Sequence, residues 1–142
     1  IDISHNALDM AKQNASKHQT DIHFECIDFL NRDLVENLPS FDIIISNPPY
    51  IPLNEMNDIE NNVKFFEPHQ ALFVPENKPL LFYDSIKSFS EKKLNTQGSV
   101  FLEAHEKYAK DIQSLFSDRE WKAFIKKDIM GKDRMVIANL CR

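Results

Sequence analysis

The stretch FDIIISNPPY, residues 41–50, decides the fold. Its first six residues form a short, nearly continuous apolar run, which is typical of a parallel β-strand that is covered on both faces. The adjacent Pro48 and Pro49 end this strand abruptly, because proline lacks the N–H group that a sheet requires. In an open α/β sheet, ligands bind just beyond the carboxyl ends of the strands. We therefore expect a binding site at Asn47, Pro48, Pro49 and Tyr50.

Helical and strand patterns alternate on both sides of this stretch. They predict a helix from Ser4 to about His18, strands at 22–27 and Val100–Leu102, helices at Phe82–Leu94 and Tyr108–Phe116, and two final strands, Trp121–Ile125 and Met135–Leu140, joined by a turn around Gly131. Residues 51–78 have no clean period, which predicts a long functional loop with a helical turn or two. This order predicts an α/β fold, with a mostly parallel sheet, crossover helices and a closing antiparallel pair.

Length and composition exclude several classes of protein. A chain of 142 residues with 42% hydrophobic and 27% charged residues forms one globular domain at most and is not disordered. Two cysteines are too few for a disulfide framework or a cysteine-built zinc site, and the five histidines show no ligand spacing. A net charge of −5 argues against tight binding to a phosphate backbone. No apolar run is long enough to span a membrane, and the first residues do not resemble a secretory signal.

The glycine content is the most informative count. Gly98 and Gly131 are the only glycines, so this sequence holds no glycine-rich phosphate or dinucleotide loop. The sequence also opens with Ile1-Asp2-Ile3, which looks like the end of a strand whose beginning is absent. We therefore expect a fragment, in which the apolar strand at 41–46 would present an unpaired edge.

The residues Asn47–Tyr50 suggest methyl transfer to a planar nitrogen. Such a nitrogen is a poor nucleophile because its lone pair is delocalised, but its two N–H groups can be aimed by hydrogen bonds to carbonyl oxygens. The Asn47 side chain offers one acceptor and the Pro48 carbonyl another, which the fixed φ angles of the prolines hold in place. Tyr50 can supply a flat wall. The alternative is an ordinary turn at the end of a strand.

The heptapeptide Ser46–Pro52, SNPPYIP, resembles the signature of the HemK/PrmC family of release factor glutamine methyltransferases. Three further segments resemble parts of the same family: FEPHQALF at 66–73, LFY at 81–83 and GKDR at 131–134. The resemblance implies a Rossmann-like, class I methyltransferase fold that uses S-adenosylmethionine and releases S-adenosylhomocysteine. It implies methyl transfer to the side-chain amide of a glutamine in the Gly-Gly-Gln loop of peptide-chain release factors. It also implies a cytoplasmic enzyme without a metal, a membrane partner or sequence-specific binding to nucleic acid.

The resemblance assigns roles to individual residues. Asn47, Pro48, Pro49 and Tyr50 would bind the substrate and form the catalytic motif, and the cofactor would contact Asp2, Ile3, Asp28, Phe29 and Asn47. Asp2 would accept hydrogen bonds from the ribose hydroxyls, and Asp28 would accept one from the adenine amino group, with Phe29 against the ring. Taken alone, Asp2 is more typical of a solvated terminal acid or helix cap than of a ligand, and the alternative for Asp28 is a loop acid beside a core phenylalanine.

Several parts of the family pattern are missing from this sequence. The glycine-rich loop, the first strand with its helix, and the N-terminal helical domain have no counterpart, so residues 1–142 are expected to form a partial methyltransferase domain that binds the cofactor weakly. Two other functions stay open. One is an amino methyltransferase acting on a flipped base of a nucleic acid. The other is a non-catalytic α/β interaction module that keeps the motif as a structural turn.

Overall fold

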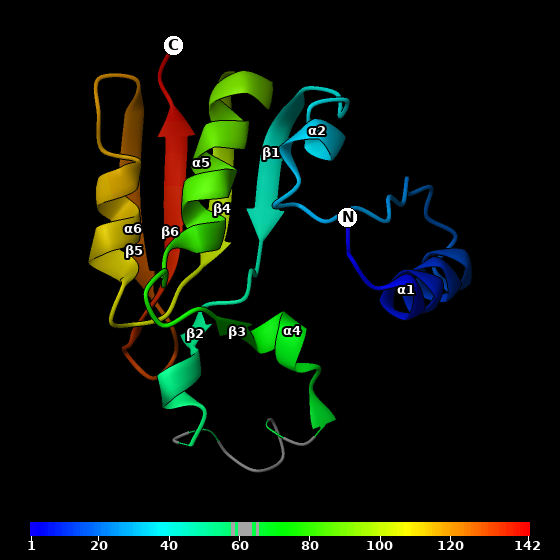
Figure 1. Cartoon of the computed structure of the whole chain (residues 1–142). Helices are drawn as coiled ribbons and strands as arrows, with labels where there is room; N and C mark the ends of the chain where they lie inside the picture. Colours follow the sequence, from blue (N-terminus) through cyan, green and yellow to red (C-terminus); the bar gives the residue numbers. More distant parts are fainter. Residues whose placement is uncertain (58, 60–63, 65) are drawn as a thin grey trace. The chain divides into compact units, whose positions relative to one another are not determined.

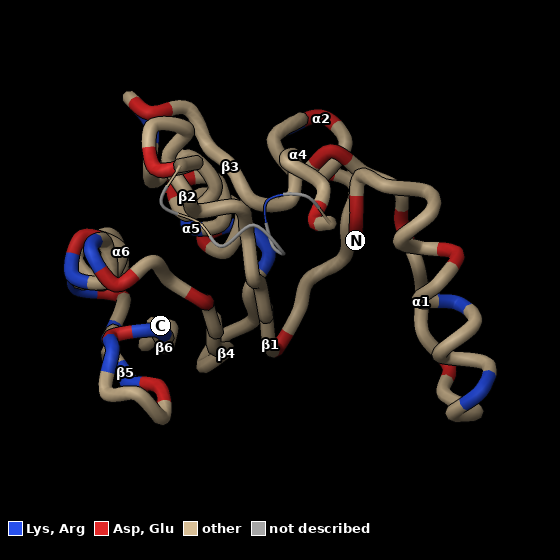
Figure 2. Tube along the Cα trace, turned by 90° about the horizontal axis from the view of Figure 1, so that it is seen from below, with Lys and Arg blue, Asp and Glu red and all other residues tan. Residues whose placement is uncertain are grey.

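The computed structural model describes residues 1–57, 59, 64 and 66–142, which divide into two compact units, Ile1–Pro39 and Ser40–Arg142 (Figure 1). The first unit contains helices α1 (His5–Lys17) and α2 (Arg32–Val35). The Ser4 hydroxyl caps α1 by accepting a hydrogen bond from the Ala7 N–H at 3.3 Å, which confirms the predicted start of this helix. Leu8 and Ala15 form its buried side, while its charged residues Asp9, Lys12 and Lys17 are exposed. Figure 2 shows acidic and basic positions spaced along α1.

The predicted strand at 22–27 is wrong as a strand. The segment makes only an isolated parallel bridge between Asp2 and Cys26. Two backbone hydrogen bonds form it, from Asp2 N–H to the Glu25 carbonyl at 3.2 Å and from Ile27 N–H to the Asp2 carbonyl at 3.0 Å. The neighbouring extended segment is short, because α1 begins at His5, so the described unit offers little backbone for a longer ladder.

The second unit is built on a four-stranded sheet in the order β1-β4-β6-β5. Its strands are β1 (Phe41–Ser46), β4 (Leu94–Glu103), β5 (Trp121–Lys127) and β6 (Asp133–Leu140). β1 and β4 are parallel, while β6 lies antiparallel between β4 and β5, so three of the four strands run in one direction. These directions confirm the predicted α/β fold with a mostly parallel sheet and a closing antiparallel pair.

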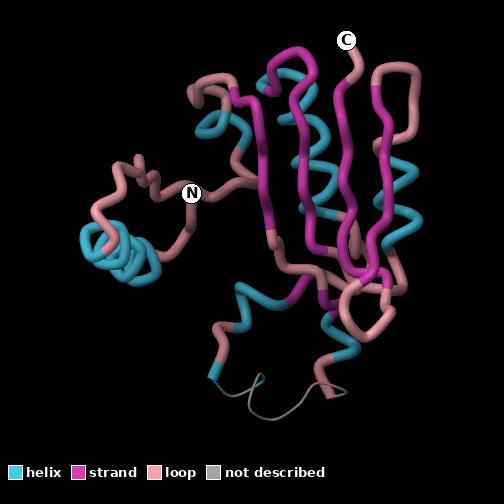
Figure 3. The backbone as a smooth tube through the Cα atoms, turned by 180° about the vertical axis from the view of Figure 1, so that it is seen from behind, coloured by secondary structure: helices cyan, strands magenta, loops and turns pink. Residues whose placement is uncertain are grey.

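Helices α5 (Leu81–Lys93) and α6 (Ala109–Leu115) lie on the same face of this sheet (Figure 3). The core between helices and sheet is apolar and includes Ile86, Phe89, Val100, Leu102, Ile112, Phe116, Trp121, Val136, Ala138 and Leu140, all of them buried. Both helices and both later strands agree with the predicted ranges to within a few residues. The spacing of their apolar residues was therefore sufficient to predict these elements.

The other face of the sheet is apolar and open in this unit. Strand register places Ile45, Phe101, Ile137 and Phe124 in one row across all four strands. Ile45 is 78% exposed and Phe124 is 52% exposed. Within this unit α5 and α6 cover only one face, so the second cover predicted for the strand at 41–46 is not found among the described residues of the unit. As expected, β1 is an edge strand, which pairs with β4 alone in the part of the unit that is described.

The region predicted as a long loop contains more structure than expected. It holds β2 (Ile51–Pro52), a 3-10 turn η1 (Leu53–Glu55), α4 (His69–Leu72) and β3 (Phe73–Val74). The helical turns were predicted, although residues 58, 60–63 and 65 lie outside the described residues. The parallel pairing of β2 with β3 was not predicted, because two residues are too few to show a period. It brings residues 72–74 beside residues 50–52.

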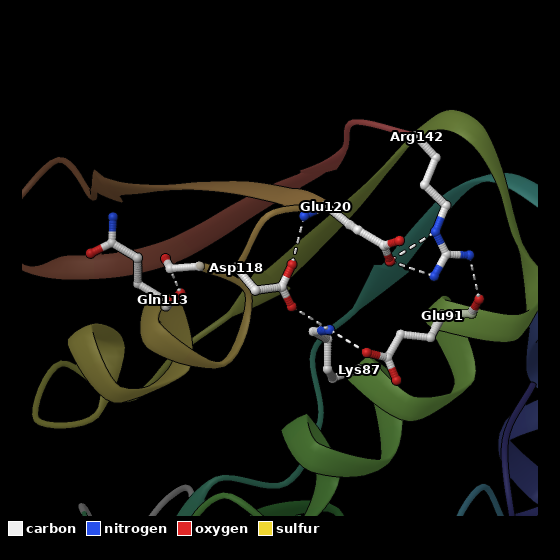
Figure 4. Close-up of polar contacts among 7 residues, drawn as sticks. Lys87, Glu91, Gln113, Asp118, Glu120 and Arg142 are labelled. Atoms are coloured by element: carbon white, nitrogen blue, oxygen red, sulfur yellow. Dashed lines mark hydrogen bonds and ion pairs between the residues drawn. The ribbon is translucent and has the colours of Figure 1, made fainter.

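A chain of polar contacts fastens α5 to the C-terminal strands (Figure 4). Lys87 forms ion pairs with Glu91 and, at 3.3 Å, with Asp118, and its Nζ lies 5.0 Å from the centre of the Trp121 ring. Nearby, Arg142 forms an ion pair with Glu120 at 2.6 Å and donates to the Glu91 carbonyl at 3.2 Å. These contacts fix the position of α5 on the sheet, at the end of the sheet opposite the motif.

Candidate functional site

The four residues Asn47–Tyr50 leave the sheet directly after β1. The register pairs Ser46 with Leu102, so the motif begins beside the last residue of β4, Glu103. Asn47 is exposed, Pro48 is buried, and Pro49 and Tyr50 are half-buried. The prolines thus anchor the segment while the amide of Asn47 stays accessible.

A small cavity lies beside this segment. It measures about 60 Å³ and is lined by Asn47, Pro48, Tyr50, Ile51, Ala71 and Leu72. The Tyr50 N–H donates to the Leu72 carbonyl at 3.2 Å, which joins the wall formed by α4 to the motif. One water needs roughly 10–15 Å³ of such space. The cavity therefore has room for a group of a few atoms.

A larger hollow of about 420 Å³ lies over the start of α5. Residues 77–81 and Asp84 line it. None of these residues was predicted to bind substrate or cofactor, and the hollow contains none of the motif. The smaller cavity is the better candidate site, because the groups that carry the predicted chemistry line it.

Glu103 at the end of β4 connects the motif to the rest of the unit. Its Oε1 accepts a hydrogen bond from the Tyr50 hydroxyl at 2.9 Å, and its backbone carbonyl accepts one from the Tyr83 hydroxyl at 2.8 Å. Burial raises the pKa of Tyr50 above its usual value, the Glu103 carboxylate raises it further, and Arg134 opposes both. Tyr50 is therefore a protonated donor near neutral pH.

His105 and Glu55 tie the turn η1 to the same place. Glu55 forms ion pairs with His105 at 3.3 Å and with Lys107 at 2.9 Å. The rings of Tyr50 and His105 meet edge to face with their centres 6.0 Å apart. Burial lowers the pKa of His105, and Glu55 opposes this shift. The hydrogen bond from Lys107 lowers the pKa of Glu55. Glu55 is thus a carboxylate at neutral pH.

The turn between β5 and β6 reaches this end of the sheet as well. Gly131 has a φ of 80°, a left-handed conformation that glycine adopts without strain. Beyond it, the Arg134 carbonyl accepts from the Ala104 N–H at 2.8 Å, and the Arg134 guanidinium pairs with Asp128 at 3.6 Å. Described residues from all four segments of the family resemblance thus lie at or near one end of the sheet.

The residues predicted to hold the cofactor belong to the first unit, apart from Asn47. The bridge of Asp2 with Cys26 and the hydrogen bond from Ile27 to Asp2 place Asp28 just beyond the residues that pair with Asp2. Asp2 Oδ1 accepts from the Ser4 N–H at 2.8 Å, and Asp28 Oδ1 accepts from the Leu30 N–H at 2.9 Å. Both aspartates are exposed, as is Ile3, while Phe29 is half-buried. Two accessible carboxylates at neighbouring ends of extended chain suit the hydroxyl and amino donors of a nucleoside.

The sequence predicted no contact with the motif or its neighbours for three residues that make one: Tyr83, Glu103 and Arg134. One signal could have indicated Glu103. It follows the apolar run Val100–Leu102 just as Asn47 follows its own strand, so both are polar residues at the carboxyl end of a strand. Tyr83 and Arg134 stood in the segments that carry the resemblance, without an assigned role.

Two further features concern membranes and metals in the described part of the chain. Within that part of the chain, no helix combines the length and the apolar character needed to cross a membrane. The same residues contain no group of three or more His, Cys, Asp or Glu side chains arranged to hold a metal ion.

Comparison with known proteins found similarity to methyltransferases. The family "Methyltransferase small domain" matches residues 1–68. The chain is 38% identical over 140 residues to a release factor glutamine methyltransferase of Flavobacterium psychrophilum, and this covers 98% of the chain and 48% of that protein. An enzyme of the same name from Bacteroides thetaiotaomicron is 35% identical over 97% of the chain and 50% of its own length. The chain therefore spans about half the length of the curated relatives it matches.

Solved structures were also found to be similar, and one of them is described here. It is a protein-(glutamine-N5) methyltransferase, described as release factor-specific, from Alicyclobacillus acidocaldarius. The match covers 86% of this chain and 99% of that chain, at 15% identity and a TM-score of 0.43.

Proposed function

We propose that this chain, as a relative of the release factor glutamine methyltransferases, forms the part of such an enzyme that binds and aims the target amide. The reaction is transfer of a methyl group from S-adenosylmethionine to the side-chain amide nitrogen of a glutamine. The substrate is the Gly-Gly-Gln loop of a peptide-chain release factor, so we place the enzyme in the cytoplasm. Residues 1–142 supply part of the methyltransferase domain.

Orientation is the main contribution of the motif. The Asn47 side-chain oxygen and the Pro48 carbonyl accept the two N–H groups of the target amide, and Tyr50 packs against its plane. This fixes the direction of the nitrogen lone pair, which is the geometric requirement for attack on a methyl carbon. Two carbonyl dipoles also stabilise the positive charge that develops on nitrogen. Tyr50 does not remove the amide proton, because its raised pKa keeps it protonated. The methyl–sulfur bond breaks as the methyl–nitrogen bond forms, S-adenosylhomocysteine leaves, and the proton passes to water after the transfer.

The cofactor contacts follow from the first unit. Asp2 accepts hydrogen bonds from the ribose hydroxyls, with Ile3 beside it, and Asp28 accepts one from the adenine amino group, with Phe29 along the ring. Their exposed carboxylates and neighbouring positions support this assignment. When bound, S-adenosylmethionine supplies an electrophilic methyl group on its sulfonium.

The observation that carries the proposal is the cavity of about 60 Å³ lined by Asn47, Pro48 and Tyr50. That volume suits the three heavy atoms of a primary amide and is far below the several hundred Å³ typical of pockets for larger ligands. A flipped purine base would require more space. Acidic and basic residues also occur together along α6 and around β5 (Figure 2), and the net charge is −5. These features favour an amide over a base of nucleic acid.

The proposal is tested with labelled S-adenosylmethionine and the protein that carries this chain, offered either a release factor or DNA. We expect label in the release factor, and loss of label when its loop glutamine is replaced. The Asn47→Ala variant is expected to lose about 100-fold or more in kcat/KM, because one of two orienting acceptors is gone.

Asn54→Ala is the matched control, because Asn54 is exposed and its amide donates to Glu76 outside the cavity. It should retain activity. Label in DNA alone would overturn the proposal in favour of a nucleic acid methyltransferase. Unchanged turnover by Asn47→Ala would leave that residue with a structural role only.

A further inference from the structure

We infer that Glu103 is a positioning residue, whose carboxylate holds the Tyr50 ring in place as a wall of the substrate cavity. This inference rests on the proposed function, since it concerns how the same cavity is shaped. Tyr50 lies in a segment that leaves the sheet after Ser46, and the rigid prolines precede it. The ring is only half-buried, so its orientation depends on what the hydroxyl at its far end contacts.

That hydroxyl contacts Glu103. The distance from the Tyr50 oxygen to Glu103 Oε1 is 2.9 Å, which is a hydrogen bond to a charged acceptor. Such bonds are stronger than those between neutral groups. The Tyr50 ring also packs edge to face with the ring of His105, with the two ring centres 6.0 Å apart. Two contacts from Glu103 and His105, at and just after the end of β4, therefore restrict the orientation of the Tyr50 ring.

Glu103 is itself fixed from two directions. On the helix side, its carbonyl accepts the hydroxyl of Tyr83, which is 1% exposed and therefore held by the core. On the sheet side, Glu103 is paired with Met135 of β6, and the next residue, Ala104, donates to the Arg134 carbonyl at 2.8 Å. Because the backbone of Glu103 is held in this way, its carboxylate keeps the Tyr50 hydroxyl, and with it the ring, in one position. Glu103 therefore acts on the cavity through Tyr50 and need not touch the substrate.

The kinetic test uses four variants of the protein that carries this chain: Tyr50→Phe, Glu103→Ala, Glu103→Gln and the double variant Tyr50→Phe/Glu103→Ala. We expect Glu103→Ala to lose about tenfold in kcat/KM for the release factor, the size expected for one hydrogen bond to a charged group. Glu103→Gln keeps a carbonyl acceptor and should recover most of this loss. The double variant should be no slower than Tyr50→Phe alone, because both changes remove the same bond.

A spectroscopic titration supplies a readout that does not require methyl transfer. Tyrosinate absorbance, measured as the difference between each protein with Tyr50 and the same protein carrying Tyr50→Phe, isolates the ionisation of Tyr50 from that of the other tyrosines. Glu103→Ala and Glu103→Gln should both lower the pH at which Tyr50 ionises, because the carboxylate raises its pKa. Circular dichroism and thermal unfolding show whether each variant is folded.

Glu106→Ala is the control, since Glu106 is an exposed glutamate nearby that pairs with Lys132. It should change neither activity nor the tyrosine titration. The inference is overturned if Glu103→Ala leaves the titration of Tyr50 unchanged, or if the losses of the single variants simply add. Absence of methyl transfer by the unaltered protein, with the titration behaving as described, would instead refute the proposed function.

Discussion

At the scale of single residues, Tyr83 shows how the core supports the site. It is 1% exposed, and its hydroxyl donates to the Glu103 carbonyl at 2.8 Å. Burial raises the pKa of this phenol above its usual range, so it stays a donor. Tyr83→Phe leaves that carbonyl without this donor, and we expect a loss of about 1–3 kcal/mol in the free energy of unfolding.

Chemical denaturation measures this loss. Tyr108→Phe is a suitable comparison, because Tyr108 is only half-buried and contacts His105 through its ring. If both variants lose equal stability, the buried hydrogen bond is not the cause. A loss confined to Tyr83→Phe supports the role assigned to the end of β4.

The candidate site could be predicted only in part at this scale. Asn47 and Tyr50 could be predicted as site residues from the sequence. Two prolines directly after an apolar strand mark the carboxyl end of that strand, where ligands bind in an α/β sheet. Their roles stay predictions. The contact of Glu103 with Tyr50 was not predicted, because the two residues are 53 positions apart in the sequence and no local pattern indicates such a contact.

At the scale of elements, η1 and the end of β4 are joined by an interaction that depends on pH. The groups around His105 are Glu55, Lys107, Arg134 and Glu106, and the net effect with burial is a lowered pKa. The folded chain therefore binds fewer protons at His105 than the unfolded chain does. The stability that comes from burying neutral His105 is present above the usual histidine pKa of about 6.5, and it is lost as the pH falls. The lowered pKa of Glu55 acts in the same direction below its usual value of 4.5.

We therefore expect the denaturation midpoint to fall between pH 7.5 and pH 5.5, and His105→Gln to show a smaller fall. His23→Gln is the control, because His23 is exposed in the first unit and contacts Glu25. Equal pH dependence in the unaltered chain and in His105→Gln would contradict the assignment.

Lys87 joins three elements, since it lies on α5 and contacts Asp118 after α6 and Trp121 at the start of β5. Its side chain is 12% exposed, so its apolar stem contributes packing as well as charge. Lys87→Ala should lower the free energy of unfolding by about 1–2 kcal/mol. The control is Lys110→Ala, at an exposed position on α6, which should change the free energy of unfolding by less than about 0.5 kcal/mol. If calorimetry shows equal losses for both variants, the contacts of Lys87 do not contribute to stability.

The elements that sequence predicted well are those with enough length to show a period. Helices α5 and α6 and strands β5 and β6 each repeat their apolar positions against one core. The two-residue strands β2 and β3 have no such repeat, and their pairing was missed. The segment at 22–27 had the alternation of a strand but lacks a sufficient partner in the described unit, because pairing requires a second chain segment as well as a suitable pattern.

At the scale of the whole molecule, the distribution of glycine sets an expectation for ligand binding. The first 97 residues contain none, so no backbone there has the freedom to approach a cofactor as closely as a glycine-rich loop does. We expect isothermal titration of the 142-residue chain with S-adenosylmethionine to show no micromolar affinity. A micromolar dissociation constant would contradict this and show that the aspartates of the first unit suffice.

An apolar row across the sheet also affects the tendency of the chain to aggregate in solution. Its members are Ile45, Phe101, Ile137 and Phe124. It ends at β1, where isoleucines meet an open edge of backbone. Such a border is a template on which further strands can grow, first from another copy and then from many. We therefore expect the Ile45→Lys variant to become turbid only at a higher protein concentration than the unaltered chain. The same row would then set the concentration at which the chain aggregates.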